Sequence, residues 1–493
     1  MSRSLTNNFS LQVAVEESLG TLPASPEWHL LEPNGVGTFG MNISTVSRAP
    51  ISKSRQRRKG TITDLNSEVN FDADLIRDHF VLLSEGFVMA SATDIYDTTP
   101  TAVTATSTYT VPSGDVLDAG YLVYARGFTN SANNGLKVTD AGCGATSVIV
   151  TDVSLVTEAS PPTNCELSVC GIRTAAGDLE VTDVTAGVVT FETTTLDFTD
   201  LGLTVGQAIY IGGEDAANNF DTAANVGYLR VISVAAHVMT CDKASQTWST
   251  EAGTDQEVDI YYGRFIRNVD VDDDDYLERS YCFEGAYTDL GGVGTDEYEY
   301  AYGNMANTMA VTLPLTDKAT MSFGFIGTTA GAPSTDRATN ADTPIEPQQT
   351  VAFNTSSDIA RLRLQETDET GLSTYFKSLT LNLNNNDSAE KVLGTLGAAF
   401  MNTGIFEVNL DAQLVFTNSA VIDAIIANTT VTLDFALKND DGGILVDIPS
   451  MTLSGGGRDF PVNESILINL TGQAFKDATL STSIGVTLFP YLP

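Results

Sequence analysis

The sequence predicts a mainly β protein: a β-sandwich or barrel core with short flanking helices and two small inserted β modules. Thr, Ser, Val, Gly, Asn and Asp are abundant among the 493 residues, a composition that favours strands and turns over helices. Most apolar stretches alternate apolar with polar residues, which is the period of a half-buried strand. Residues 304–313 and 319–326 predict one hairpin of this kind, and the Ser-Gly-Gly-Gly run at 454–457 predicts a turn. One arrangement, a strand, a long loop, a second strand and a helix, also occurs twice along the chain.

The first of these units lies near the N-terminus. An alternating strand is expected at residues 36–46 and a returning strand at residues 61–71. The apolar residues of the first strand are expected to face the core together: Phe39, Met41 and Ile43. A helix follows, for which Asp72 or Asp74 can accept the free N–H groups of the first turn and Gly86 suits the end.

The second unit lies near the other end of the chain. It has a strand at 375–383, a loop at 384–403 and a returning strand at 404–416, and Asn418 or Ser419 can cap the short helix that follows. Two such units about three hundred residues apart suggest a core built from two related halves. The alternative is a chance likeness, because the strand–strand–helix arrangement is common.

The chain is strongly acidic, with a formal net charge of −38 from 25 basic and 63 acidic residues. This charge argues against nucleic-acid binding, because attraction to phosphate depends on Lys and Arg. It fits either simple solubility or a surface that must stay near DNA without binding it. Composition does not separate these two interpretations.

One loop is basic in this acidic chain. Residues 48–59 hold six of the 25 basic residues and no acid: Arg48, Lys53, Arg55, Arg57, Arg58 and Lys59. Basic clusters are typical of nucleic-acid contacts, but no aromatic residue accompanies this one for stacking on bases. A contact with another, acidic copy of the chain is the favoured interpretation, and a solvated loop is the alternative.

The middle of the chain has short strands that alternate with Gly, Asn and Asp turns. Two stretches share a Gly-led strand, an Ala-Asn-Asn loop and a further strand, and these loops lie at 132–134 and 217–219. They predict two small β modules in tandem. The expected domains, in chain order, are a first core part, two inserted modules and a second core part: 1–95, 96–162, 163–260 and 261–493.

No pattern of residues requires catalytic chemistry. The three histidines are far apart in sequence, and the five cysteines are too scattered for a disulfide framework or a zinc site. The run from Asp270 to Asp275 resembles a calcium loop but lacks its Gly and Glu, so a solvated turn is favoured. We therefore expect no catalytic residue, no cofactor and no metal ion.

The chain also lacks the usual signals for membranes and secretion. No apolar run approaches the ~20 residues of a membrane helix, and the first residues lack the apolar core of a signal peptide. We expect a soluble protein that is made in a cytoplasm and has no membrane partner.

Several stretches resemble one known family. They are Glu-Glu-Ser-Leu-Gly-Thr at 16–21, the basic loop, Gly-Thr-Ile-Thr-Asp-Leu-Asn-Ser-Glu-Val at 60–69, Tyr-Leu-Glu-Arg at 276–279, Gly-Asn-Met-Ala-Asn at 303–307, and Gln-Ala-Phe-Lys-Asp-Ala-Thr-Leu at 473–480. In this order they resemble the tail tube proteins of long-tailed, siphovirus-like bacteriophages. The likeness covers about residues 10–90 and 262–493, and the paired modules resemble insertions in some of these proteins.

The resemblance implies a structural virion protein that is assembled in the host cytoplasm. Subunits with a tube-forming β-sandwich would form hexameric rings, with a continuous β-barrel around a channel, and the rings would stack. DNA and the tape-measure protein would pass through this tube without specific binding, and tail terminator and baseplate proteins would be further partners. On this view the basic loop contacts the next ring.

The same view predicts which side chains line the channel. Alternation places Asp64 and Glu68 on one face of the first returning strand, and Glu407 and Asp411 on one face of the second. Acids and neutral amides without basic residues would repel phosphate. On a monomer the same alternation would simply meet solvent.

A different class of function fits the inserted modules. Tandem β modules could make the chain a virion-surface or extracellular binding protein that recognises a glycan or a receptor. Purified tubes with a central hole would favour the tail tube, and monomers that bind cells would favour the alternative.

Overall fold

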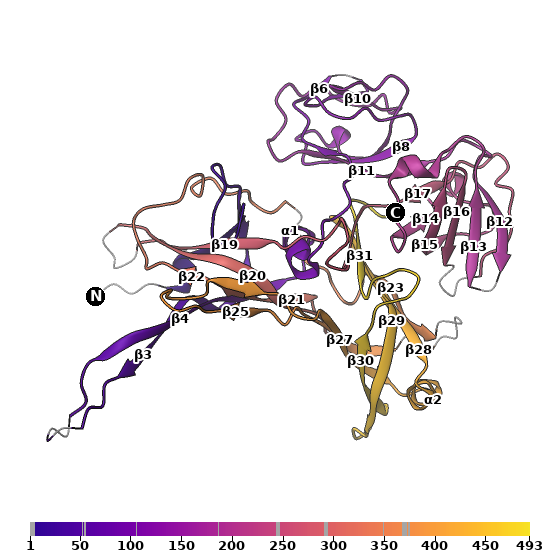
Figure 1. Cartoon of the computed structure of the whole chain (residues 1–493). Coiled ribbons are helices and arrows are strands. Elements are labelled where there is room, and N and C mark those ends of the chain that lie inside the picture. Colours follow the sequence, from indigo (N-terminus) through magenta and orange to yellow (C-terminus); the bar gives the residue numbers. More distant parts are fainter. Residues whose placement is uncertain are drawn as a thin grey trace. The chain divides into compact units, whose positions relative to one another are not determined.

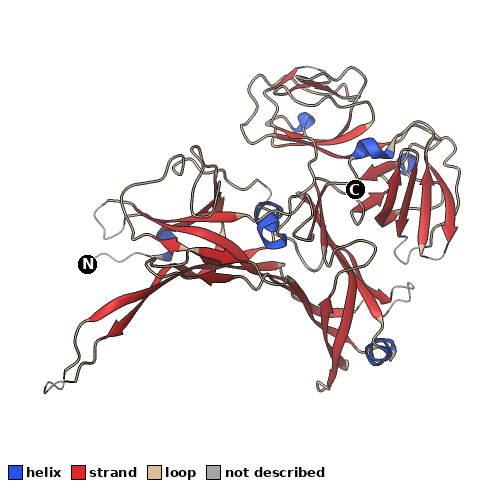
Figure 2. Cartoon of the chain, in the orientation of Figure 1, coloured by secondary structure: helices blue, strands red, loops and turns tan. Residues whose placement is uncertain are grey.

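The computed structural model describes residues 5–493 except 52, 54, 55, 105, 186, 243–246, 290–293, 349, 367–371, 373 and 374. Strands dominate the described residues, and the two α-helices among them are α1 (Arg77–Val88) and α2 (Ala420–Ala427) (Figures 1 and 2). The predicted mainly β fold is confirmed. The chain forms two compact units: unit 1 has residues 1–90, 271–356 and 377–413, and unit 2 has residues 91–270, 357–376 and 414–493.

Unit 1 contains α1 and the strands of residues 1–90, 271–356 and 377–413. β24 and β27 each extend a residue or two into unit 2. The strands of unit 1 are β1 (Phe9–Val15), β2 (Trp28–Leu31), β3 (Pro33–Ser47), β4 (Gly60–Asp74), β19 (Ser280–Tyr287), β20 (Glu297–Leu313), β21 (Thr320–Gly327), β22 (Thr329–Ala330), β24 (Phe376–Asn384), β25 (Ser388–Glu390), β26 (Phe400–Asn402) and β27 (Glu407–Val415).

All strand pairs of unit 1 are antiparallel. β1 pairs with β2 and β19, and β19 pairs with the first half of β20. The second half of β20 has β21 on one edge and β24 on the other. β21 pairs with β4, which forms a long hairpin with β3 (Figure 1). This hairpin and the predicted pair of strands at 304–313 and 319–326 are confirmed.

Aromatic side chains fill the core between α1 and the sheet. Phe71, Phe283, Phe323 and Phe325 come from β4, β19 and β21, and Phe87 comes from α1, with ring centroids 4.8–6.3 Å apart in the contacting pairs. Such rings bury large areas and contribute most of the packing energy of a small core.

The ends of α1 differ from the prediction. Ile76 is the N-cap and offers no side-chain hydrogen bond. Asp74 remains in β4, where its carboxylate accepts from Lys318 Nζ at 2.7 Å. The helix runs past Gly86 and ends at Met89, which adopts the left-handed conformation. Gly86 is needed for close packing instead, because a Cβ there would lie 2.6 Å from the Tyr281 ring.

Residues 5–35, the N-terminal arm, pack on unit 1. β1 lies beside β19, and Trp28 is buried with its Nε1 donating to the Thr339 carbonyl oxygen at 3.1 Å. Nearby, burial lowers the pKa of His79 to about 4, and its Nε2 accepts from the Glu32 backbone N–H at 3.4 Å. This histidine is a neutral structural residue.

Unit 2 contains the insert, which we define as residues 91–270, and a C-terminal sheet. The strands of the insert are β5 (Asp97–Thr98), β6 (Ala102–Thr104), β7 (Thr108–Thr110), β8 (Tyr121–Arg126), β9 (Gly135–Val138), β10 (Ser147–Ile149), β11 (Glu166–Arg173), β12 (Glu180–Thr185), β13 (Val188–Glu192), β14 (Ala208–Ile211), β15 (Gly227–Ala235), β16 (Val238–Asp242), β17 (Asp259–Tyr261) and β18 (Arg264–Arg267). The strands of the C-terminal sheet are β23 (Ile359–Glu366), β28 (Thr430–Asn439), β29 (Gly442–Asp459), β30 (Leu467–Ala474) and β31 (Gly485–Phe489).

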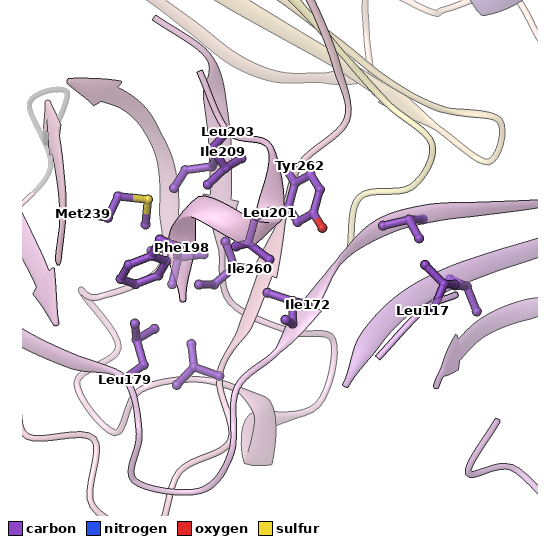
Figure 3. Close-up of a cluster of buried hydrophobic side chains, with 14 of the residues drawn as sticks. Leu117, Ile172, Leu179, Phe198, Leu201, Leu203, Ile209, Met239, Ile260 and Tyr262 are labelled. Atoms are coloured by element: carbon purple, nitrogen blue, oxygen red, sulfur yellow. The ribbon is translucent and has the colours of Figure 1, made fainter. Parts of the chain in front are cut away.

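One sheet runs through most of the insert. β11 pairs with β8 on one edge and β17 on the other, and β17 continues through β14, β15, β16 and β13 to β12. A single buried apolar cluster extends from Val103 to Tyr262, and Figure 3 shows Phe198, Leu201 and Ile260 converging in it. The predicted division at residue 162 stays a prediction.

The two Ala-Asn-Asn loops have the same local geometry. The Asn134 side chain accepts from Phe128 N–H at 3.0 Å and donates to the Phe128 carbonyl at 2.9 Å. The Asn219 side chain makes the same two bonds to Gly213, each at 3.0 Å. The repeated sequence therefore encodes a repeated amide clamp, which closes a tight loop after a strand.

The C-terminal sheet is built around β29. Its first half lies between β28 and β31, its second half pairs with β30, and β23 pairs with β28. The predicted turn at Ser454–Gly457 is wrong. Gly455 and Gly456 have positive φ and form a bulge inside β29, which continues to Asp459. Glycine supports such a bulge because it has no Cβ to oppose the left-handed conformation.

Candidate functional site

A polar face covers one side of five antiparallel strands in unit 1, in the order β4, β21, β20, β24 and β27. Along each strand the residues of this face alternate with buried residues of the opposite face, and they are half-buried or exposed. Gly324 of β21 is the exception: it is buried, and it lies opposite Asn70 of β4 on one side and Thr308 of β20 on the other. The other residues of this polar face are Asp64, Asn66, Glu68, Asn70 and Asp72 of β4; Thr320 and Ser322 of β21; Thr308, Ala310 and Thr312 of β20; Thr380, Asn382 and Asn384 of β24; and Glu407, Asn409 and Asp411 of β27.

The strand register joins these positions into one face. Asp72 pairs with Ser322, Ser322 with Ala310, and Ala310 with Asn382. Asn382 Nδ2 then donates to Asp411 Oδ2 at 2.9 Å. Residues opposite one another in antiparallel strands point to the same side, so this row crosses all five strands.

The polar face is acidic and has no basic residue of its own. All five strands are described throughout, and none of their face positions is Lys or Arg. Lys377 of β24 has the opposite parity, that of the buried Leu379. The carboxylates therefore stand among hydroxyls and amides, which are neutral and form only weak contacts with phosphate.

Two lysines reach carboxylates of β4 from outside this set. Lys391 Nζ lies 2.5 Å from Asp64 Oδ1 and 2.6 Å from Asn66 Oδ1, and this hydrogen bond lowers the pKa of the Asp64 carboxyl. Lys318 pairs with Asp74. Lys391 comes from the loop between β24 and β27, so periodicity within a strand could not reveal it.

The four acids predicted to line a channel lie on this face. Asp64 and Glu68 are on β4, and Glu407 and Asp411 are on β27, with three strands between them. Asp72 belongs to the same face but was missed, because the predicted strand stopped at residue 71. The prediction for Ile43 is wrong: its side chain is 42% exposed, whereas Phe39 and Met41 are half-buried.

The basic loop lies at the tip of the β3–β4 hairpin. Its described basic residues are all exposed: Arg48, Lys53, Arg57, Arg58 and Lys59. Arg55 lies outside the described residues. A long two-stranded hairpin places this positive group away from the unit 1 core, where it is available to another molecule.

A buried carboxyl lies at the base of the loop between β24 and β27. Asp387 N–H donates to Asn307 Oδ1 at 2.9 Å, and Asn385 Nδ2 donates to the Ala306 carbonyl at 2.7 Å, so the loop is held to β20. Both carboxyl oxygens of Asp387 are buried. The Gly404 backbone N–H favours the charged carboxylate, but burial outweighs it. Burial raises the pKa of Asp387 to about 6.

The described residues contain no other obvious site. No group of three or more His, Cys, Asp or Glu side chains among them could hold a metal ion. The five cysteines are free thiols. The acidic run at 272–275 is exposed, with Asp275 N–H donating to Asp273 Oδ1 at 3.0 Å. Neither described helix has the length and apolar character required to cross a membrane.

Comparison with known proteins identifies the family. A family model described as phage tail tube protein matches residues 6–474. A search of curated proteins finds no individual match. The family match spans nearly the whole chain, including the polar face, the basic loop and the insert. The chain therefore belongs to the phage tail tube protein family, a family of structural proteins of the virion tail.

Proposed function

We propose that this chain is the major tail tube subunit, which stacks as closed rings into a hollow tube that conducts phage DNA into the host. The observation that carries the proposal is the polar face, which spans five strands and bears acids but no basic residue of its own. Such a face suits the wall of a channel for a polyanion. The sixfold ring that the resemblance implies is part of this proposal.

The electrostatics of the polar face favour passage over binding. Duplex DNA carries one negative charge per ~1.7 Å, and proteins that bind it do so with Lys and Arg. Asp64, Glu68, Glu407 and Asp411 would repel the phosphates, while the Asn and Thr side chains offer no charge to hold them. DNA and the tape-measure protein would therefore slide through the channel.

The basic loop supplies the contact between rings. In a chain with net charge −38, an exposed group of cations is attracted to the acids of another copy. A contact between different surfaces of identical subunits repeats without limit along an axis, as a tube requires. Tail terminator and baseplate proteins would close the two ends, and assembly would take place in the host cytoplasm.

Electron microscopy of the purified protein tests the proposal directly. We expect tubes with a central hole. A preparation that stays monomeric under all assembly conditions and binds host cells would contradict the proposal and support the receptor-binding alternative.

Charge reversal in virions tests the channel. The variant combines four substitutions: Asp64→Lys, Glu68→Lys, Glu407→Lys and Asp411→Lys. Tubes should stay intact, but DNA ejection should slow because the new lysines attract the DNA phosphates. The slowing should be greater at low salt, where this attraction is less screened. The matched control reverses four exposed acids of the insert: Asp115→Lys, Asp183→Lys, Asp200→Lys and Glu257→Lys. Equal ejection rates in the two variants would show that the polar face does not line the channel.

A further inference from the structure

A small cleft lies within the insert, and we call it the insert cleft. It has a volume of about 270 Å³ and is lined by residues from the start of β8, the end of β11 and the 3₁₀-helix Phe198–Leu201 with the loop before it. β8 and β11 are neighbouring strands, and the Arg173 backbone N–H donates to the Gly120 carbonyl at 2.8 Å. The cleft therefore lies where the two tandem parts of the insert meet.

The walls of the insert cleft are fixed without a ligand. The buried Asp259 carboxylate accepts from Arg173 Nε at 2.7 Å and from Nη2 at 3.0 Å. The buried Asp178 carboxylate accepts from the backbone N–H groups of residues 194–196 at 2.8–3.1 Å. Phe198 and Leu201 hold the 3₁₀-helix in the buried apolar cluster (Figure 3). A preformed site of this kind loses little conformational entropy on binding.

Three polar groups in the cleft are available to a ligand. Arg173 Nη1 donates to no described group, because Nε and Nη2 already occupy both oxygens of Asp259. Asp118 and Asp200 are exposed, and their carboxylates accept from no described donor. The cleft thus presents N–H donors and carboxylate acceptors together in one small volume.

The charges of the cleft disfavour most classes of ligand. Asp118, Asp197 and Asp200 would repel a phosphate or another anion, and Arg173 would repel an amine that entered beside it. No group of three or more His, Cys, Asp or Glu side chains in the described part of the chain could hold a metal ion. The class that satisfies both signs of charge is a neutral ligand that has many hydroxyl groups.

A single sugar ring has the size and the chemistry that the cleft requires. Each hydroxyl can donate and accept, so neighbouring hydroxyls can bind a carboxylate and a guanidinium at the same time. Tyr121 and Leu196 line the cleft and are half-buried, so they offer an apolar surface to the C–H groups of a sugar. Pockets for drug-sized ligands measure roughly 300–1,000 Å³, so this smaller cleft suits one ring.

We propose that the insert cleft is a binding site for a neutral saccharide, in the form of one hexose or N-acetylhexosamine unit. Asp118 and Asp200 accept hydrogen bonds from its hydroxyls, Arg173 Nη1 donates to a hydroxyl or to the ring oxygen, and the Tyr121 ring packs against its C–H groups. This site goes beyond the tube function and does not depend on it, because all of its residues lie in the insert.

Saturation-transfer NMR of the full chain tests for the ligand. The probes are the methyl glycosides of glucose, galactose and mannose, and N-acetylglucosamine. At least one should bind with a Kd of about 1 mM, since so small a ligand makes few contacts. Inorganic phosphate should not bind. The proposal is overturned if none of the four sugars gives a signal at about 20 mM, or if phosphate binds in the cleft and they do not.

A substitution that fills the cleft tests its location. Ala175 lines the cleft and is exposed, so Ala175→Trp should abolish sugar binding without changing the thermal midpoint. A variant that keeps the parent affinity would place the sugar elsewhere and overturn the proposal.

Two conservative substitutions test the acceptors. Asp118→Asn with Asp200→Asn keeps the shape of the cleft but removes two charged acceptors, so binding should weaken by about tenfold. The matched control is Asp115→Asn with Asp183→Asn, which changes two exposed acids of the insert that do not line the cleft. Equal affinities in the two double variants would contradict the assigned contacts.

Virions distinguish a sugar of the cell surface from a free sugar. If the ligand belongs to the host surface, the sugar that binds in NMR should slow the attachment of virions to host cells, and Ala175→Trp should slow it to the same extent. Unchanged attachment, with binding in NMR intact, would assign the cleft to a free saccharide. Tubes should form in every variant, so these results leave the tube function to its own test.

Discussion

Each unit has an α-helix that precedes a strand of its sheet, but the length of chain between the helix and that strand differs greatly. In unit 2, two residues separate α2 from β28, whereas in unit 1 the insert and the segment after it separate α1 from β19. By sequence the insert belongs to the first half of the core. In the structure it packs in unit 2, where Leu122, Ala208 and Tyr261 share a buried cluster with Leu445 and Phe489 of the C-terminal sheet.

A partly buried group of charges joins the insert to the C-terminal sheet. Arg230 of β15 donates to Asp447 of β29 at 2.9 Å and also pairs with Asp242 of β16. The Ala208 backbone N–H donates to Thr487 Oγ1 at 3.0 Å. Residues 91–270, which follow α1 in the chain, therefore pack with the C-terminal sheet in unit 2. Four experiments test how far the two halves differ.

The largest effect is expected at the tips of the two hairpins. Arg57→Glu with Arg58→Glu in the basic loop should reduce long tubes to single rings or monomers without affecting folding, because both side chains are exposed. Tube length in electron micrographs and sedimentation measure this. The same kind of change in the other hairpin loop, Lys391→Glu with Thr395→Glu, should leave long tubes. If both pairs shorten tubes equally, the two hairpins do not differ in function.

The next effect concerns the insert. Arg230→Met should lower the free energy of unfolding by about 2–4 kcal/mol, because the buried Asp447 and the half-buried Asp242 lose the cation that they share. Urea denaturation measures this. Adding Asp447→Asn should recover part of the loss, since one of the uncompensated charges is removed. A loss below about 1 kcal/mol would mean that the insert is not energetically part of unit 2.

A pH effect is expected from the loop base in unit 1. Burial raises the pKa of Asp387 to about 6, above the ordinary value near 4, so the folded protein holds this proton between these two pH values. The contribution of this group to the free energy of unfolding is fully present below pH 4. It is lost as pH rises through 6, by about 2–3 kcal/mol in total, because the folded protein must then ionise a buried carboxyl.

Asp387→Asn removes this dependence. Denaturation of the variant and the parent at pH 4.5 and pH 7.5 should show a smaller fall for the variant. Asn386→Asp, at the exposed neighbouring position, is the control for a carboxyl that is not buried. An identical fall in the parent and in Asp387→Asn would show that Asp387 titrates normally.

The smallest effect is expected at Lys391. Because this lysine lowers the pKa of Asp64 through a hydrogen bond, Lys391→Ala should move that pKa back toward its ordinary value. Titration followed by NMR measures the shift, while the thermal midpoint should stay within about 1 °C, since exposed ion pairs contribute little. An unchanged pKa would mean that Lys391 does not hold Asp64 in solution.

Much of the core could be predicted from the sequence, because a period of two identifies strands and their buried faces. The hairpins β3–β4 and β20–β21 and the polar positions of β4 and β27 all lie where alternation placed them. Features that depend on a distant neighbour could not be predicted this way. Gly86 looked like a helix end but accommodates the Tyr281 ring, and Ser454–Gly457 looked like a turn but is a bulge within β29.

The sequence by itself determined the local alternation, the acidic charge, the basic loop and the repeated strand–loop–strand–helix plan, since each depends on residues close together in the chain. Only the tertiary structure decided that β4 and β27 share one face across three intervening strands, that Lys391 reaches Asp64, and that the insert joins the core of unit 2. These outcomes depend on which strand edges pair and which apolar surfaces bury one another, and many registers satisfy the same local pattern.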